Sequence, residues 1–307
     1  MGYQPNGNDL GATPSYVNKV TLFVAAPTAD GSSVDINYLC KAYSKEEQIA
    51  WAKQLQAQGI EVLMSLMDTP TTQWNNVNIP AFVQTFKNEI IDGEWGLNGV
   101  DIDLESGMPP DVWAATFTTL IHEFRKVLGP KAASPSGMSK SRISVAAYRP
   151  SLEQPILSAA GTDLDWLNTM AYWNNAEENE QLFNTYLQYV SQVNMGIGVD
   201  YQNGQSTDLV QTGLMAQFAA KTNGCGMMEF ALNNDCPTYS GQPQWTWAST
   251  IEKNLPPQQT PQTILMLTQG INPGYTVTEY LENQINANGG KFSMSFCSFP
   301  NDLQPTR

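Results

Sequence analysis

One stretch decides the fold and the chemistry of this chain: Leu97-Asn98-Gly99-Val100-Asp101-Ile102-Asp103-Leu104-Glu105. Apolar and acidic residues alternate along it, and on a β-strand residues i, i+2 and i+4 share one face. The carboxyl groups of Asp101, Asp103 and Glu105 therefore project from one side, although like charges so close raise one another's pKa values at a cost in stability. A strand that keeps one carboxylic acid protonated near neutral pH has a use for this arrangement. We interpret Glu105, at the end of the strand, as that acid, and expect Asp101 and Asp103 below it to share charge or a proton.

Two other interpretations of the acidic strand compete with the catalytic one. It could be an edge strand whose polar face meets water, or a site for Ca²⁺ or Mg²⁺, which carboxylates at this spacing suit. The flanks argue against an exposed edge, because Ile90-Ile91 precede the strand and a long apolar-periodic helix follows it, as in a βα repeat. No Asp/Asn-Gly loop of the EF-hand kind supports the cation site. We therefore favour catalysis, then the cation site, then the solvated face.

Strand and helix patterns alternate along most of the chain. Besides the acidic stretch, runs typical of strands occupy residues 20–25, 34–39, 61–67, 143–148, 164–173, 195–201 and 225–232. Helical patterns occupy residues 44–59, with a Ser44 N-cap, Glu47 three residues on and a closing Gly59, and then 79–91, 109–128, 180–193 and 208–222. Eight such units over about 250 residues predict an α/β fold, a closed (β/α)₈ TIM barrel. The rival, a doubly wound open sheet, has no Gly-x-Gly-x-x-Gly motif or P-loop in its favour.

We place a domain boundary at residue 257, because Leu255-Pro256-Pro257-Gln258-Gln259 marks a change in composition. Residues 1–257 form the predicted barrel, and residues 258–307 form a small C-terminal β-α-β extension. Its strands are expected at residues 263–268 and 292–299 and its helix at 276–288. A unit of this size is marginal on its own. We therefore expect it to pack on the barrel or to bind a protein partner.

Composition and charge limit the kinds of molecule that the chain is expected to bind. The formal net charge of −14 disfavours nucleic acid, whose phosphates require Lys and Arg, and is compatible with a neutral polysaccharide. No apolar run reaches membrane-spanning length, so no membrane partner is expected. Residues 1–14 show no signal-peptide pattern, while the Gln/Asn/Thr-rich, lysine-poor composition favours an extracellular location.

Histidine and cysteine exclude some kinds of site. A single histidine, His122, gives no basis for His-based triads or His-rich zinc sites, and we expect it on the surface or in the core of a helix. The four cysteines form no CxxC pair. A Cys225–Cys236 disulfide and buried free thiols are both compatible with the sequence.

The run Gly-Val-Asp-Ile-Asp-x-Glu, which ends at Glu105, resembles the signature of family 18 glycoside hydrolases, the chitinases and endo-β-N-acetylglucosaminidases. The family pattern is Asp-Gly-x-Asp-x-Asp-x-Glu at the end of the fourth barrel strand, and Asn98 stands here in place of its first Asp. The resemblance implies that Glu105 is the general acid/base and that Asp103 orients the substrate's acetamido group. Asp101 would be the partner of Asp103 below it.

Barrel catalysis occurs at the C-terminal ends of the strands, so the residues there are the candidate site. Ser65 resembles the small hydroxyl residue that chitinases place beneath the acidic row, and a small core residue is the alternative. Asp68 is interpreted as a helix cap rather than a substrate contact. Tyr148 and Arg149 are expected at the barrel mouth, where a turn before Pro150 is the simpler interpretation.

The sixth strand ends in Met170-Ala171-Tyr172-Trp173-Asn174-Asn175, which resembles the family's Met-x-Tyr-(Asp/Asn). The resemblance implies that the Tyr172 hydroxyl binds the acetamido oxygen, and a core tyrosine is the alternative. Trp173 takes the place of the family's Asp or Asn, and Asn174 follows one position later. Tyr201, at the end of the seventh strand, is expected to form a subsite wall, and a merely polar strand end is the alternative.

The eighth strand departs furthest from the family. Its members end this strand in a Met-x-Trp-like segment whose tryptophan forms the floor of the sugar site, whereas this chain has Met227-Met228-Glu229-Phe230. We expect Glu229 in the place of the indole, which removes aromatic contact with the sugar and adds a carboxylate. Phe230, Trp245 or Trp247 could compensate from nearby.

The resemblance implies a substrate-assisted mechanism, because family 18 is an exception to the two-carboxylate scheme of most glycosidases. The 2-acetamido oxygen of the −1 sugar attacks the anomeric carbon while Glu105 protonates the leaving oxygen. Water activated by Glu105 then opens the intermediate with retention, and no metal or organic cofactor is needed. The implied reaction is cleavage of β-1,4 linkages after N-acetylglucosamine, in chitin or in an N-glycan core.

Two alternatives stand beside the hydrolase. Glu229 favours a weakly active or inactive chitinase-like glycan-binding protein. The C-terminal extension favours a barrel component of a larger assembly.

Overall fold

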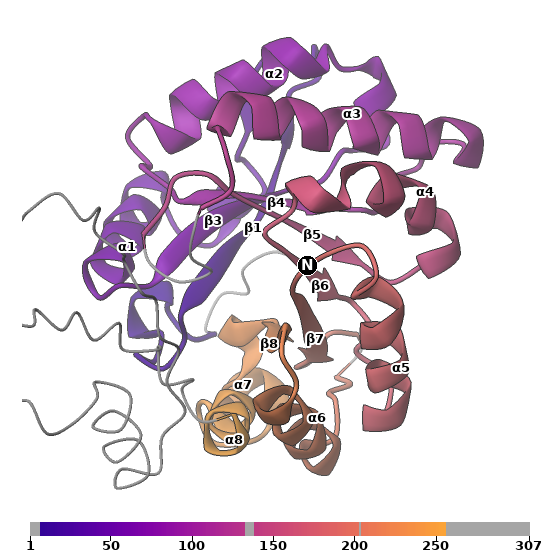
Figure 1. Ribbon diagram of the computed structural model, residues 1–307. Coiled ribbons are helices and arrows are strands. Elements are labelled where there is room, and N and C mark those ends of the chain that lie inside the picture. Colours follow the sequence, from indigo (N-terminus) through magenta and orange to yellow (C-terminus); the bar gives the residue numbers. More distant parts are fainter. Residues whose placement is uncertain (1–6, 133–137, 203, 256–307) are drawn as a thin grey trace, which may run out of the picture. The chain divides into compact units, whose positions relative to one another are not determined.

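The computed structural model describes residues 7–132, 138–202 and 204–255. Parallel strands form the centre, in the order β1 (Lys19–Pro27), β3 (Glu61–Leu66), β4 (Gly99–Asp103), β5 (Arg142–Ala147), β6 (Trp166–Thr169), β7 (Val193–Gly198) and β8 (Cys225–Phe230). The helices lie around the outside of these strands (Figure 1). They are α1 (Lys45–Ala57), α2 (Ile79–Phe86), α3 (Pro110–Leu128), α4 (Pro150–Ala160), α5 (Ala176–Tyr186), α6 (Leu209–Lys221), α7 (Pro237–Ser240) and α8 (Thr246–Asn254). This alternation confirms the predicted α/β class.

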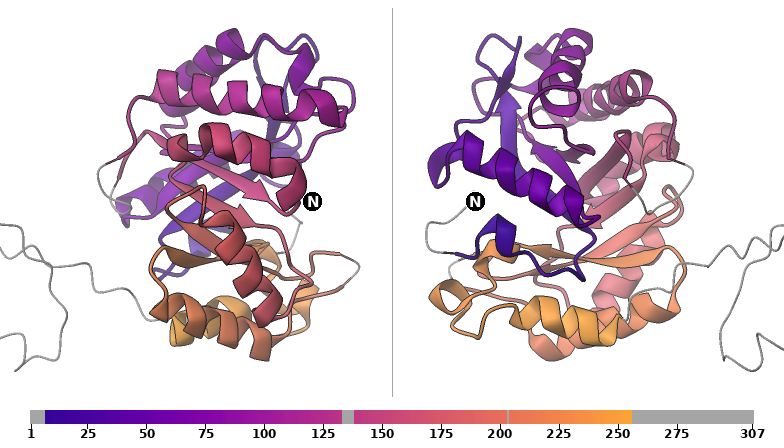
Figure 2. Two further views of the ribbon diagram at one scale, coloured as in Figure 1. Left: turned by 45° about the vertical axis from the view of Figure 1, so that its right-hand side comes forward. Right: turned by 90° about the vertical axis from the view of Figure 1, so that its left-hand side faces the viewer.

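The first and last parallel strands approach each other. The rings of Phe23 on β1 and Phe230 on β8 meet edge to face, with centroids 5.5 Å apart. Nearby, the backbone N–H of Asn8 donates to the carbonyl oxygen of Asn233 at 2.8 Å. The right-hand view of Figure 2 shows this beginning of the described chain beside the segment that follows β8. These contacts bring the two edges of the parallel sheet together, as a closed barrel requires.

The expected second barrel strand at residues 34–39 is wrong. Only β2 (Val34–Asp35) is extended, and it pairs antiparallel with the end of β1 as the return arm of a hairpin. The side chain of Asp35 accepts a hydrogen bond from the backbone N–H of Asn37 at 2.8 Å, which turns the chain out of the strand. The parallel strands of the described residues therefore number seven.

Local sequence signals explain the helices that were predicted. At the start of α1, the Ser44 hydroxyl accepts from the N–H of Glu47 and the Glu47 carboxylate accepts from the N–H of Ser44, which is the predicted capping box. The predicted helix at 79–91 is α2 followed by a π-helical turn at Lys87–Ile91. Helix α4 was not predicted, because Pro150 at its start and Pro155 inside it weaken a helical pattern.

The described residues also test the expectations for the cysteines, the histidine and membrane-spanning helices. Cys225 and Cys236 are free thiols, so the disulfide alternative is wrong. His122 lies on the surface of α3, where its ring pairs with Asp163 at 2.7 Å. None of the helices in the described segments is both long and apolar enough to cross a membrane. The predicted C-terminal extension at residues 258–307 lies outside the described residues.

The N-terminal ends of the strands hold a buried ionic network. The Arg142 guanidinium, 1% exposed, donates from Nε to Glu61 at 2.8 Å and lies 3.4 Å from Asp165 through Nη1. Lys19 adds a contact of 3.4 Å to the other oxygen of Glu61. Buried charges of this kind require their partners, because an unpaired ion in the interior is costly.

We expect Arg142→Met to lower the free energy of unfolding by about 3–5 kcal/mol, because the buried carboxylates of Glu61 and Asp165 would lose the cation that they share and keep the weaker set of contacts with Lys19 and Arg125. Chemical denaturation measures the change. Lys126→Met is the matched control, because the ion pair of Lys126 with Glu123 is exposed, and such pairs contribute about 0–1 kcal/mol. Equal losses in the two variants would contradict this view of the network.

Candidate active site

Asp101 is the base of the acidic row. It lies on β4, is 4% exposed, and accepts hydrogen bonds from Ser144 Oγ at 2.5 Å, Ser65 Oγ at 3.1 Å and Asn168 Nδ2 at 3.3 Å. Burial raises the pKa of this carboxyl, and the three hydrogen bonds oppose that rise. Its oxygens are thus bound by neighbouring side chains. Within the described segments, no group of three or more His, Cys, Asp or Glu side chains is placed to hold a metal ion.

Asp103 is a buried carboxyl of the row that has one oxygen without a partner among the described residues. It is 4% exposed, and burial, followed by the charges of Glu105 and Asp101, holds its pKa well above the ordinary value. The backbone N–H of Glu105 opposes this rise in the pKa. The Oδ1 of Asp103 is buried and has no hydrogen-bond partner among the described residues. Asp103 therefore keeps one acceptor free for a ligand that donates a hydrogen bond.

Glu105 lies just beyond the end of β4 and is half-buried. Its carboxyl lies near the phenol of Tyr148, which follows β5. Burial, followed by the charge of Glu105, raises the pKa of the Tyr148 phenol. Glu105 thus lies at the C-terminal end of the barrel, near a residue from the next strand.

Asp68, which follows β3, accepts a hydrogen bond from Ser106, the residue after Glu105. It is 5% exposed, and its Oδ2 accepts from Ser106 Oγ at 2.6 Å and from the backbone N–H of Trp74 at 2.9 Å. Trp74 begins a 3₁₀ helix, so the interpretation of Asp68 as a cap agrees with this contact. The bond to Ser106 is a further role that was not predicted.

Tyr172 lies beside the acidic row. Burial, followed by the charges of Asp103, Asp101 and Glu105, holds the pKa of its phenol well above the ordinary value. Its ring stacks on Phe230, with centroids 5.6 Å apart and planes 11° from parallel. The structure therefore brings together the four residues predicted to be catalytic, which come from the ends of β4 and β6.

Other aromatic rings surround Tyr172. Trp173 is 61% exposed and contacts both Tyr148 and Tyr172 edge to face, with centroids 6.0 and 6.5 Å apart. The ring of Tyr201 lies 5.5 Å from that of Tyr172. Gly198 allows this approach, because a Cβ there would lie 2.3 Å from Tyr201 Cδ1 and 2.8 Å from Tyr172 Cβ. We call Tyr148, Tyr172, Trp173 and Tyr201 the aromatic cluster.

The expectation for Glu229 needs correction. Glu229 pairs in register with Ile197, which belongs to the apolar core, whereas Phe230 pairs with Gly198 and stacks on Tyr172. Successive residues of a strand point to opposite faces, so Glu229 points away from the acidic row. Burial, followed by the charge of Asp235, holds its pKa well above the ordinary value. Phe230, and not Glu229, faces the site.

Ser65 and Arg149, two residues predicted to contact substrate, instead contact other residues of the protein. Ser65 is 1% exposed and donates to Asp101, so it supports the acidic row and does not line the mouth. The Arg149 guanidinium carbon lies 4.5 Å from the ring centroid of Trp113 on α3 and 4.8 Å from that of Tyr148. Arg149 therefore packs between Tyr148 and the helix layer.

Asn174 and Trp245 are not brought into contact with the acidic row. Asn174 lies in a turn after β6, where its backbone N–H donates to Ala171 at 3.1 Å. Trp245 is the N-cap residue of α8, and its backbone N–H donates to the carbonyl oxygen of Asp235 at 2.9 Å. Their roles in substrate binding stay predictions.

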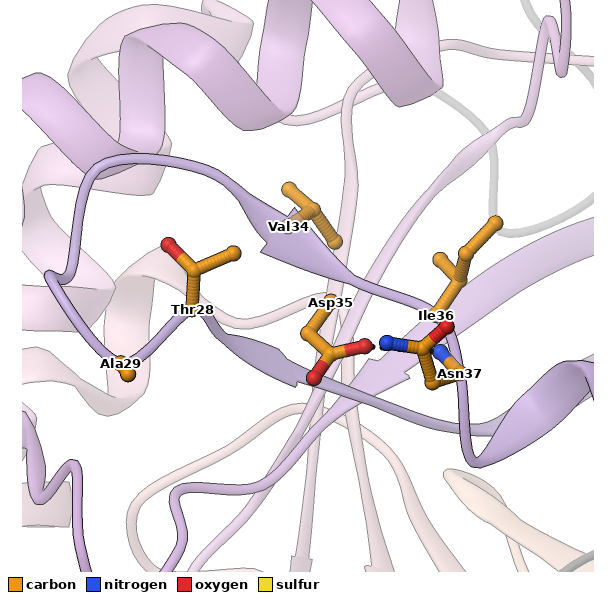
Figure 3. A pocket seen from close by; sticks show the side chains of 6 residues that line it. All are labelled: Thr28, Ala29, Val34, Asp35, Ile36 and Asn37. Atoms are coloured by element: carbon orange, nitrogen blue, oxygen red, sulfur yellow. Dashed lines mark hydrogen bonds between the residues drawn. The ribbon is translucent and has the colours of Figure 1, made fainter.

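A shallow hollow of about 240 Å³ lies in the β1–β2 hairpin. Thr28, Ala29, Val34, Asp35, Ile36 and Asn37 line it (Figure 3). A second hollow, of about 620 Å³, lies over α5 and α6. Neither contains a carboxyl of the acidic row or a residue of the aromatic cluster, so the candidate site rests on the side chains described above.

Comparison with known proteins decides the family. The family model of the endo-β-N-acetylglucosaminidase EndoS TIM-barrel domain matches residues 1–229. The chain belongs to this family, within family 18 of the glycoside hydrolases. No curated protein sequence matches the chain significantly.

Solved structures of other family 18 proteins share the fold. A chitinase from Pseudoalteromonas aurantia is 19% identical with a TM-score of 0.60, over 83% of this chain and 98% of that chain. A fungal endo-β-N-acetylglucosaminidase is 14% identical with a TM-score of 0.60, over 84% and 97%. A mutant class V chitinase from Nicotiana tobaccum in complex with NAG4 is 11% identical with a TM-score of 0.60, over 81% and 96%. The family resemblance and the predicted barrel are thereby confirmed.

The departure of this family 18 chain at Asn98 has a structural reason. Asn98 is 3% exposed, and its Oδ1 accepts from the backbone N–H of Val62 and from Gln56 Nε2, both at 2.9 Å. Its Nδ2 donates to the carbonyl oxygen of Ser139 at 3.0 Å. An ionised aspartate could not donate that bond. Asn98 thus joins neighbouring elements at the start of β4, away from Glu105.

Ser144 and Asn168 were missed among the residues of this family 18 site. Both are polar residues inside strands of the predicted barrel, and that was a usable signal. Ser144 pairs in register with Asp101, and Asn168 Oδ1 accepts a hydrogen bond from Asn194 Nδ2 at 2.9 Å. Which polar side chains meet Asp101 depends on the register between strands, which the sequence of one strand does not contain.

Proposed function

We propose that the chain is a retaining glycoside hydrolase that cleaves β-1,4 linkages after N-acetylglucosamine by substrate-assisted catalysis. The observation that carries the proposal is Asp103, a buried carboxyl with an unpartnered oxygen between two other carboxyls and close to Tyr172. An acceptor of this kind suits an amide N–H, because a buried polar atom without a partner is costly. The acetamido group of N-acetylglucosamine supplies that donor.

In this proposal the substrate provides the nucleophile and Glu105 moves the protons. The acetamido oxygen forms a bond to the anomeric carbon as the bond to the leaving oxygen breaks, and Glu105 gives its proton to that oxygen. A water molecule then attacks the same carbon and loses its proton to Glu105, which restores the acid and retains the configuration. Its half-buried place beside Tyr148 is compatible with access to substrate and to water.

Asp103 and Tyr172 are assigned to the acetamido group. Asp103 accepts the hydrogen bond from its N–H and balances the positive charge of the oxazolinium-like intermediate. The Tyr172 hydroxyl donates to the acetamido oxygen, and the stack on Phe230 fixes the plane of its ring. Asp101 supports Asp103 from below, held by its own three donors. The site derived from these residues requires no cofactor.

The matched family and a similar structure bear names that point to endo-β-N-acetylglucosaminidases, which supports the N-glycan core as a substrate. A similar chitinase holds NAG4, which supports chito-oligosaccharides. Incubation with chitopentaose and with an N-glycosylated protein, with products identified by mass spectrometry, tests both. We expect shortened oligomers or a protein that retains one N-acetylglucosamine. A folded protein that leaves both substrates intact would overturn the proposal.

The glycan-binding alternative has lost its main support, because Glu229 faces away from the acidic row. The assembly alternative rests on residues 258–307, which are not described. We therefore retain the hydrolase as the single proposed function.

Trp173→Ala is expected to raise KM about tenfold, equivalent to about 1.4 kcal/mol, with a smaller change in kcat. Trp173 is the most exposed ring of the aromatic cluster and offers an apolar face to a sugar. Met138→Ala is the control, because Met138 is 50% exposed but lies before β5, at the other end of the barrel. An unchanged KM in Trp173→Ala would exclude Trp173 from the binding surface.

A further inference from the structure

A fully buried carboxylate lies behind the site and is not used in the proposed chemistry. Glu153 on α4 has no exposed surface. Its Oε1 accepts from the backbone N–H groups of Tyr148 at 2.9 Å and Arg149 at 2.8 Å. Its Oε2 accepts a hydrogen bond from the hydroxyl of Tyr186, which is 1% exposed.

These three donors come from two units of the barrel that carry the site. Tyr148 and Arg149 belong to the segment that joins β5 to α4, and the phenol of Tyr148 lies near the carboxyl of Glu105. Tyr186 ends α5, the helix that follows the turn bearing Tyr172. One carboxylate therefore fixes the backbone under Tyr148 and links it to the next βα unit.

We propose that Glu153, with Tyr186, is a positioning residue for Glu105, acting through the backbone of Tyr148. This inference rests on the proposed function for its consequence in catalysis. The placement of Tyr148 itself follows from the contacts alone. Glu153 binds the backbone N–H groups of Tyr148 and Arg149. If this backbone shifts, the Tyr148 hydroxyl moves away from Glu105.

Two substitutions at Glu153 separate geometry from charge. Glu153→Leu removes every acceptor and leaves the N–H groups of Tyr148 and Arg149 without partners. Glu153→Gln removes the same charge but keeps one oxygen for both N–H groups, and its amide can donate to the oxygen of Tyr186. A positioning role predicts that Gln rescues what Leu destroys, whereas an effect of charge alone predicts that the two variants behave alike.

The first readout needs no turnover. The protein is labelled with ¹³Cζ-tyrosine, and the Tyr148 resonance at pH 7 is assigned by its loss in Tyr148→Phe. Glu105→Gln calibrates the shift that accompanies a changed Tyr148–Glu105 contact. We expect Glu153→Leu to move the Tyr148 resonance by a similar amount and Glu153→Gln to leave it near its wild-type position. The same resonance position in the Leu and Gln variants would overturn the proposal.

If Glu153→Leu fails to fold, as judged by circular dichroism, Tyr186→Phe carries the test. It removes one donor and keeps the charge of Glu153, and we expect a smaller shift of the Tyr148 resonance in the same direction. A resonance unchanged in Tyr186→Phe would then count against the proposal.

Turnover supplies the second readout. We expect Glu153→Leu to lower kcat roughly tenfold to a hundredfold with little change in KM, because small displacements of catalytic groups have effects of this size. Glu61→Gln, at a buried carboxylate in the opposite end of the barrel, should leave kcat per folded molecule unchanged. Wild-type protein without turnover but with the expected resonance shifts would overturn the proposed function and leave the positioning role standing.

Discussion

Glu105→Gln is expected to lower turnover roughly 10²–10⁴-fold while glycan binding is retained, because loss of a general acid/base typically costs that much. Glutamine keeps the volume of the side chain but cannot protonate a leaving oxygen at neutral pH or accept a proton from water. The change is confined to the chemical step, so the dissociation constant for the glycan should stay within a fewfold of the wild-type value. Steady-state kinetics and calorimetry with the same glycan measure the two quantities.

Glu46→Gln is the matched control for this variant. Glu46 is an exposed acid in the first turn of α1, and its loss changes the net charge by the same amount. It should leave turnover unchanged. Equal rates for Glu105→Gln and the wild type would remove Glu105 from the role of acid/base.

Asp103→Asn is expected to reduce turnover roughly 10²–10³-fold, the size of effect seen when one group that stabilises developing charge is removed. Asparagine can still accept a hydrogen bond from the acetamido N–H, but it carries no negative charge to balance the intermediate. Rate and glycan affinity should therefore separate, with the larger loss in kcat. A kcat equal to that of the wild type would reject the substrate-assisted scheme.

The same variant has a predicted effect on pH dependence. Burial, followed by the charges of Glu105 and Asp101, holds the pKa of Asp103 well above its ordinary value. Below that raised pKa the side chain is protonated and neutral, and as the pH rises through it the stabilising charge appears. We expect the wild-type rate to rise with pH across this titration, and this limb to be absent from the profile of Asp103→Asn.

The acidic row could be predicted because its geometry depends on one strand alone. The two-residue spacing of Asp101, Asp103 and Glu105 places them on one face whatever the neighbouring strands do. The capping box at Ser44 could be predicted for the same reason, since both partners lie within four residues. By contrast, Ser144 and Asn168 meet Asp101 only through the register of separate strands.

The error at Glu229 has a related physical cause. Adjacent residues of a strand point to opposite faces, so a difference of one residue in the match to the family pattern exchanges the residue in the site for its neighbour. The contact of Phe230 with Tyr172 and with Phe23 identifies the inward residue, and both contacts are between segments far apart in the sequence. The short hairpin at β2 was likewise decided by pairing with β1.

The most direct test of the account removes the nucleophile from the substrate. Rates are compared for the glycan that the wild-type protein cleaves, chitopentaose or an N-glycosylated peptide, and for the same glycan carrying glucosamine in place of N-acetylglucosamine before the cut. Because the acetamido oxygen makes the first bond to the anomeric carbon, we expect a loss of more than about 10³-fold, as for removal of a well-placed intramolecular group. Cleavage of the two glycans at similar rates would contradict the central claim.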